Sequence, residues 1–177
     1  NDLHHYHSGV MSYISRDTKL DYSGDDTVVI DYEWTPDTAA FAVDDVMSSL
    51  IELPNAVIAP GGTGRVVTVS LLQKAGSGSP QLTDVNVVLF KKSFTPAAIN
   101  AAMTYAGTLG DIAEVINLDM TWFPITSATA TIQNFTLDRP FQAAADETSL
   151  WAIVICREAV TYAASSKLLL RVAIKRD

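Results

Sequence analysis

Short apolar runs separated by turn-forming residues recur along the chain from residue 27 onward. Runs of this length that are rich in β-branched and aromatic residues, and that end at Gly, Pro, Asn or Asp, are typical of β-strands. This pattern predicts strands over residues 27–34, 65–72, 85–90, 120–123, 128–135, 150–156 and 168–174, with a further short strand over 159–162.

The stretch over residues 46–53 suits either a strand or a short helix by the spacing of its apolar residues. We interpret it as a strand, because Pro54 closes it. Two clusters of Gly with Pro or Ser predict loops, at residues 60–64 and at residues 74–80.

One segment favours helix over strand. In residues 95–103, Thr95 is suited to cap a helix, Pro96 fits its first turn, and the alanines that follow have high helix propensity. Another brief turn is predicted near residues 110–115. The chain is therefore expected to hold one or two short helices among its strands.

The run over residues 85–90 is apolar almost throughout, where a half-buried strand would alternate. It predicts burial on both faces or at a subunit contact. The total of apolar strand is also large for one small domain, which favours buried contacts with other subunits. The lone cysteine, Cys156, lies inside an apolar run and is interpreted as a small buried hydrophobe.

About eight short strands with turn signals between them indicate a mainly β fold, an antiparallel sandwich or jelly-roll-like domain. The chain has 177 residues, which suits a single domain with a substantial core. The first residues show no steady period. We therefore expect an N-terminal arm over residues 1–26 and one β-sandwich domain over residues 27–177.

Apolar residues make up 48% of the chain and charged residues 18%, a balance typical of folded domains. No apolar run approaches the roughly 20 residues needed to span a bilayer, so we expect no membrane partner. The opening residues lack the pattern of a signal peptide, and nothing in them directs secretion.

The formal net charge is −8, which argues against nucleic acid as a partner, because phosphate binding needs clustered Lys and Arg. Residues 1–60 hold eleven acidic residues against two basic ones, a balance of −9, so the acidity belongs to the N-terminal part. This part is either a solvated segment or an acidic arm that docks on a basic surface. For the second case we expect residues 1–37 to make the contact, with Asp17, Asp21, Asp25 and Asp26 as the candidate contact residues.

All histidines lie near the start of the chain, at His4, His5 and His7. None is therefore available in the expected core for a Ser-His-Asp or Cys-His arrangement, and we expect no enzyme and no cofactor. Clustered imidazoles bind transition metals, and a trimer would gather three arms near one axis. These residues are weak metal candidates beside the simpler interpretation of a polar arm.

Other motifs also have plainer interpretations than catalysis or binding. The aspartates around Gly24 lack the ligand spacing of an EF-hand, and residues 61–64 lack the Lys-Ser/Thr of a phosphate loop. Adjacent acids, as at residues 44–45 and 146–147, give no evidence of the facing geometry of a glycosidase. Tryptophans could form a sugar platform if exposed, but belong more often to core or interface; they are Trp34, Trp122 and Trp151.

A series of short segments from about Thr38 onward carries a recognisable pattern. It comprises residues 39–46, 61–64 leading into 66–72, 87–90, 139–141, 148–155 and 163–171. In these segments the chain resembles a group of small structural proteins encoded in tailed-phage genomes, among them capsid decoration proteins. The resemblance covers about four fifths of the chain and rests on pattern. It implies a compact β domain added to a virion, with no catalytic residues to carry over.

The resemblance and the composition together predict a bacteriophage capsid decoration or cement protein. Its expected partners are the major capsid protein and copies of itself, with a trimer favoured. Its expected location is the capsid surface of the virion, after synthesis in the host cytoplasm. The alternatives are a receptor- or glycan-binding module of a tail or fibre, and another structural subunit of the capsid or tail tube.

Overall fold

The computed structural model describes residues 26–81, 83–119 and 123–177. In this part of the chain the fold is built from β-strands, with one 3₁₀ turn, η1 (Leu109–Asp111), and no α-helix. The strands are β1 (Thr27–Trp34), β2 (Ile51–Leu53), β3 (Thr63–Lys74), β4 (Val85–Phe90), β5 (Ile112–Leu118), β6 (Phe123–Thr126), β7 (Thr129–Gln142), β8 (Leu150–Cys156) and β9 (Lys167–Arg176).

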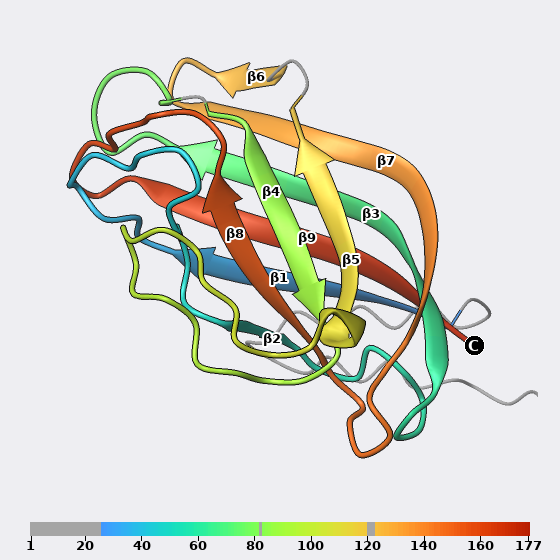
Figure 1. Cartoon of the computed structure of the whole chain (residues 1–177). Helices are drawn as coiled ribbons and strands as arrows, with labels where there is room; N and C mark the ends of the chain where they lie inside the picture. The colour runs from blue at the N-terminus through green and yellow to red at the C-terminus, as the bar shows by residue number, and fades with distance from the viewer. Residues whose placement is uncertain (1–25, 82, 120–122) are drawn as a thin grey trace, which may run out of the picture.

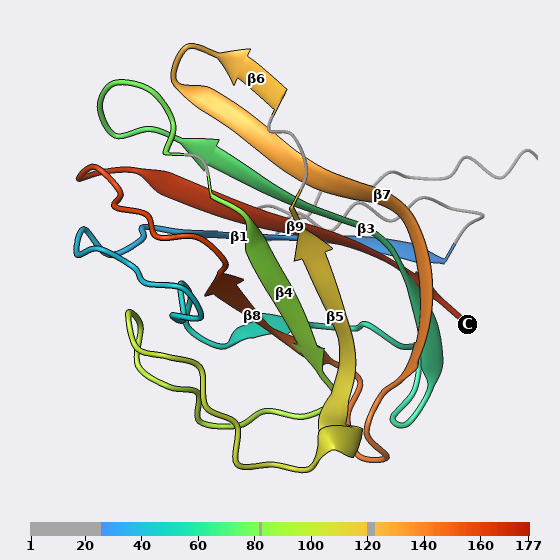
Figure 2. The same cartoon turned by 45° about the horizontal axis from the view of Figure 1, so that its top comes forward.

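The strands form two antiparallel sheets that pack face to face (Figures 1 and 2). A five-stranded sheet has the order β1-β9-β3-β7-β6, and a four-stranded sheet has the order β2-β8-β4-β5. Four strand pairs are nested in the sequence: β1 with β9, β2 with β8, β3 with β7 and β4 with β5. The predicted mainly β, sandwich and jelly-roll-like fold is confirmed, and β6 is an addition outside the nested pairs.

The main core lies between the sheets and follows the alternation of strand side chains. In β9, for example, Leu168, Leu170 and Val172 are buried while Arg171 is exposed. Both sheets contribute a row of aliphatic side chains to this core. Its members include Val66, Val69, Leu71, Val85, Val87, Leu89, Leu150, Ala152, Val154, Leu168, Leu170, Val172 and Ile174.

A second, smaller core lies on the outer face of the four-stranded sheet. The alternate residues of β4 and β8 point to this face, and Val88, Phe90, Ile153 and Ile155 are buried there. They are covered by the segment that joins β4 to η1, residues 91–108, which we call the cover. Phe94, Ala97, Met103 and Tyr105 of the cover pack against them.

The apolar run of β4 is therefore buried on both faces, as the sequence predicts, and the covering atoms come from the same chain. The rings of Phe90, Phe94 and Tyr105 form a cluster, with centroids 4.5 to 4.9 Å apart. The apolar surplus of β4 and β8 is thus used within the domain. On these two strands it is not a sign of a subunit contact.

The helix predicted over residues 95–103 is wrong. Backbone groups of this segment bond to a neighbouring loop: Asn100 N donates to Val46 O at 2.9 Å, and Met103 N donates to Asp44 O at 2.9 Å. Asn100 also has a φ of 63°, which a helix does not allow. Bonds between the loops and packing of the apolar side chains on β4 and β8 outweigh the helix propensity of the alanines.

The remaining predicted elements were met to different degrees. The strands over 27–34, 85–90 and 150–156 are confirmed at both ends, whereas the stretch over 46–53 is strand only at Ile51–Leu53. The strand predicted over 120–123 lies outside the described residues except for Phe123. Val160 forms one isolated bridge to Phe41 in place of a short strand. The turn predicted near 110–115 is mostly β5.

Two predictions about single features of the core and loops are confirmed. Cys156 is fully buried in β8, and its burial raises the pKa of the thiol. Residues 60–64 form a tight turn into β3, with Gly61 at a φ of +71°. No helix in the described part of the chain is long and apolar enough to cross a membrane.

Candidate functional site

The residues predicted to contact a capsid lie mostly outside the described part of the chain. This holds for Asp17, Asp21 and Asp25, and equally for the metal candidates His4, His5 and His7. Asp26 is described, and it is bound within the chain: its carboxylate forms an ion pair with Arg176, and its carbonyl accepts a hydrogen bond from Arg176 N at 2.7 Å. Asp26 therefore closes the end of the β1–β9 pair.

The residues just after Asp26 belong to the domain. β1 pairs along its whole length with β9, from Thr27 opposite Lys175 to Trp34 opposite Leu168. Trp34 Nε1 donates a hydrogen bond to Met47 O at 2.9 Å, which ties β1 to the loop before β2. Any arm that acts independently of the domain must end before β1.

The acidic pair at residues 44–45, one of the two considered for a glycosidase, serves local structure. The buried Asp45 accepts a hydrogen bond from Ala42 N at 2.6 Å and shapes the loop before β2. Asp44 forms an ion pair with Arg157 at 3.3 Å. Among the described residues, no three of His, Cys, Asp and Glu gather closely enough to hold a metal ion.

The two described tryptophans do not share a surface. Trp34 is half-buried and packs against the main core, whereas Trp151 is half-buried and packs in the second core. Trp122 lies outside the described residues. A sugar platform made of Trp34 and Trp151 together is therefore absent from this domain.

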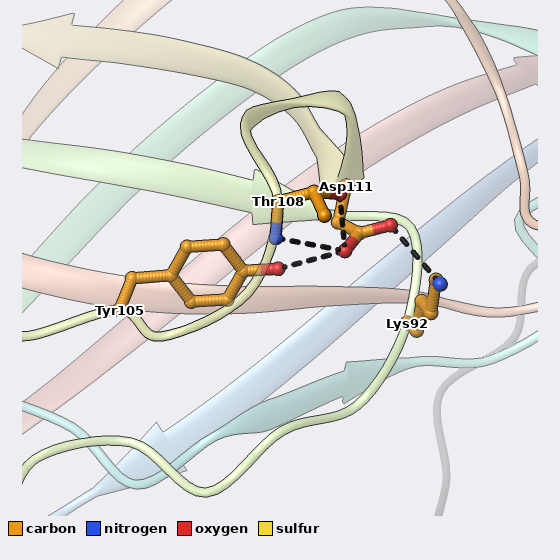
Figure 3. Close-up of polar contacts among 4 residues, drawn as sticks. All are labelled: Lys92, Tyr105, Thr108 and Asp111. Carbon is orange, nitrogen blue, oxygen red and sulfur yellow. Dashed lines mark hydrogen bonds and ion pairs between the residues drawn. The ribbon is translucent and has the colours of Figure 1, made fainter.

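One polar cluster is built around Asp111, at the point where the cover meets β5 (Figure 3). Its Oδ2 accepts hydrogen bonds from Thr108 Oγ1 at 2.9 Å, Thr108 N at 3.3 Å and Tyr105 OH at 3.3 Å. Its Oδ1 lies 3.1 Å from Lys92 Nζ. Lys92 belongs to the start of the cover and Tyr105 and Thr108 to its end, so one carboxylate joins both ends.

This geometry shifts the pKa values of the groups in the cluster. Hydrogen bonds from Thr108 and Lys92 lower the pKa of Asp111, and the hydrogen bond to Asp111 raises the pKa of Lys92. Loss of solvent, followed by the charge of Asp111, raises the pKa of Tyr105. The cluster is a latch for the cover, since each of its polar groups has a partner inside the chain.

The most distinctive surface of the described domain is the edge strand β6, residues Phe123–Thr126, which we call the β6 edge. All four of its residues are exposed, and Phe123 and Ile125 keep 53% and 56% of their surface in contact with solvent. Within the described residues β6 pairs with β7 alone, and Figures 1 and 2 show it at the outer margin of the five-stranded sheet. It buries none of its own side chains in either core.

The sequence around the β6 edge is uncharged. No Asp, Glu, Lys, Arg or His occurs between Asp119 and Asp138. Exposed edge strands of monomeric proteins are commonly protected by charged side chains, which discourage other chains from docking. Two large apolar side chains on an uncharged edge are instead typical of a surface that another molecule covers.

The outer face of the five-stranded sheet has the opposite character. Arg171 Nε and Nη2 donate to the Asp31 carboxylate at 2.7 and 2.6 Å, and Arg65 Nη1 lies 3.0 Å from Asp138 Oδ1. The hydrogen bond to Asp31 raises the pKa of Arg171. These ion pairs suit contact with water on this part of the face.

Sequence reasoning placed the contact residues in the acidic start of the chain and did not single out the β6 edge. A usable signal was present in the long uncharged run, which contains aromatic and β-branched residues. A scan against protein-family models matched none of them, and a search of the curated proteins found no similar sequence.

Proposed function

We propose that the chain is a structural protein of a tailed-phage virion that decorates the head and binds the major capsid protein. Two features support this function. The first is the resemblance of residues 39–171 to small virion proteins described above, and the second is the jelly-roll-like frame, which is frequent among viral capsid domains. A jelly-roll-like frame hosts many functions, so the function of this chain depends on its surface and not on the frame alone.

The observation that carries the proposal is the β6 edge. Phe123 and Ile125 are exposed on a strand that contributes nothing to either core, in a stretch without any charge. Leaving apolar surface in water is unfavourable, by about 25 cal/mol per Å². Such an edge is expected in a protein that functions as part of an assembly.

The mechanism of a decoration protein is mass action. A protein that binds the assembled shell and not its free subunits stabilises the shell by its binding free energy. Modest contacts that repeat around a shell add together through multivalency. No bond has to be made or broken for this function.

The contact with the capsid is assigned to the segment before β1, because its acidic residues suit a basic partner surface. The structure sets the right boundary for testing it. A deletion that reached residue 37 would remove β1, the partner of β9, and would unfold the domain. A deletion of residues 1–25 keeps Asp26 and its contacts with Arg176.

The test is co-sedimentation with purified heads that lack the protein. We expect the chain without residues 1–25 to stay folded by circular dichroism and to lose binding to heads. A full-length variant with Asp17→Asn, Asp21→Asn and Asp25→Asn is the matched control for charge, and we expect it to bind more weakly, with a shallower dependence on salt. Full binding by the shortened chain would refute the assignment of the contact.

The number of copies per virion tests the proposal as a whole. Quantitative mass spectrometry of purified particles should find the chain in a ratio comparable to the major capsid protein. A few copies per particle would favour the alternative, a tail or fibre module that binds a receptor glycan, since the jelly-roll frame also occurs in lectins. Absence from particles would exclude every virion function.

A further inference from the structure

The β6 edge needs a partner, and the structure restricts what kind of contact this can be. Pro124 has no backbone N–H, and the register of β6 on β7 shifts between Pro124 and Thr126. A proline and an irregular register both hinder the addition of a further strand to an edge. The contact must therefore rest on the side chains of Phe123 and Ile125.

Charge narrows the choice of partner. The acidity lies in residues 1–60, with a balance of −9, whereas residues 61–177 balance to +1, so two copies repel where their acidic parts approach each other. A surface that meets its own copy must avoid placing like charges together, because a symmetric contact sets the same patch against itself. The β6 edge meets this requirement, since none of its four residues is charged.

The position of β6 also favours contact between copies. It is the outermost strand of its sheet, and Figures 1 and 2 show it beyond the ends of β4 and β5, away from the second core. A second copy of this chain therefore fits the β6 edge in charge and in access.

We propose that the β6 edge is the self-association contact of this protein, in which Phe123 and Ile125 pack against the same edge of a neighbouring copy. The biological purpose of this contact rests on the proposed virion function. The contact adds to that function by naming a second copy of the chain as the partner of the β6 edge. Aromatic side chains commonly dominate such contacts, so Phe123 is the expected anchor.

The test is sedimentation velocity of the purified full-length chain over a series from micromolar to near-millimolar concentration. We expect the wild type to associate reversibly. The double variant Phe123→Ser, Ile125→Ser should associate only at concentrations about ten-fold higher or more. The matched control is Ile58→Ser, which removes a side chain of 60% exposure from a loop outside β6 and should leave association unchanged. Circular dichroism and thermal melting establish that all variants fold.

Three results would overturn the contact: a wild type that stays monomeric throughout, a double variant that associates as well as the wild type, or an equal loss in Ile58→Ser. The virion function fails separately, in the copy-number measurement, which needs no associated state in solution. If the purified chain self-associates but is absent from particles, the self-association contact stands and the virion function fails. If the chain is abundant in particles but the wild type is monomeric in solution, the virion function stands and the contact fails.

Discussion

The outer faces of the two sheets differ in their relation to water: one carries apolar side chains under a loop, and the other carries charged side chains in contact with solvent. On the four-stranded sheet, Val88, Phe90 and Ile153 point outward, and the cover buries them. On the five-stranded sheet, the outward residues include Asp31 and Arg171, which pair with each other and face solvent. An outer sheet face is therefore stable in water either because its side chains are polar or because a loop of the same chain covers its apolar side chains.

The difference explains why a segment without regular structure is so well defined. The cover has few backbone hydrogen bonds within itself. It is fixed by backbone hydrogen bonds to residues 44–46, by its side chains and by the Asp111 latch. Loops usually run over polar surfaces and vary freely. Here the loop has become part of a core, so its sequence is constrained as a strand would be.

The largest expected effect comes from weakening the second core. Phe90→Ala should destabilise the domain by about 3–5 kcal/mol, because it removes a buried ring that contacts Phe94 and Tyr105. Chemical denaturation measures this change. Leu169→Ala, on the outer face of the five-stranded sheet, is the comparison and should cost no more than about 1 kcal/mol. Equal losses of stability in the two variants would mean that the outer faces of the two sheets contribute equally to the stability of the domain.

A smaller effect is expected from opening the latch. Asp111→Asn removes the charge that Lys92 and Thr108 recognise, and should lower the melting temperature at neutral pH. The pKa of Asp111 is lowered in the folded state, so its stabilisation is present above the unfolded pKa of about 3.9 and is lost as pH falls through the folded pKa. The gap between wild type and variant should therefore close below about pH 4.

Tyr105→Phe is the control for the latch. It removes the hydroxyl that donates to Asp111 but keeps the ring that packs on Phe90. Its melting temperature should lie between those of the wild type and Asp111→Asn. A gap between wild type and Asp111→Asn that stays constant across pH would show that the carboxylate does not act through its charge.

The smallest effect is expected on the charged face. A double-mutant cycle with Asp31→Ala and Arg171→Ala should give a coupling below about 1 kcal/mol, since the guanidinium is well exposed and its ion pair is screened. The coupling should shrink further at high salt. A larger coupling that is insensitive to salt would mean that this face is as tightly bound as the covered one.

Strand patterns predicted the fold well where burial alone decided the structure. The apolar runs of β4 and β8 could be located from residue type, since both their faces are buried. The strand β5 could not, because its edge position leaves Glu114 and Asn117 among apolar neighbours and blurs the alternation. The cover could not be predicted either, since its form depends on bonds to residues 44–46, distant in sequence.

The candidate site was harder to predict than the fold. Charge drew attention to the acidic start of the chain, and Asp26, the described member of that set, proves to be bound to Arg176. The β6 edge depends on exposure, which a sequence does not show: Phe123 and Ile125 match core residues in type. The informative feature of the sequence was the absence of charged residues over residues 120–137.

The nested pairing also has a consequence for synthesis on the ribosome. β1 emerges first of the nine described strands, yet the strand it pairs with is β9, which emerges last. At rates of about 5–20 residues per second, β1 waits on the order of ten seconds for its partner. Of the described strands, β1 is therefore the one that waits longest for its partner during synthesis.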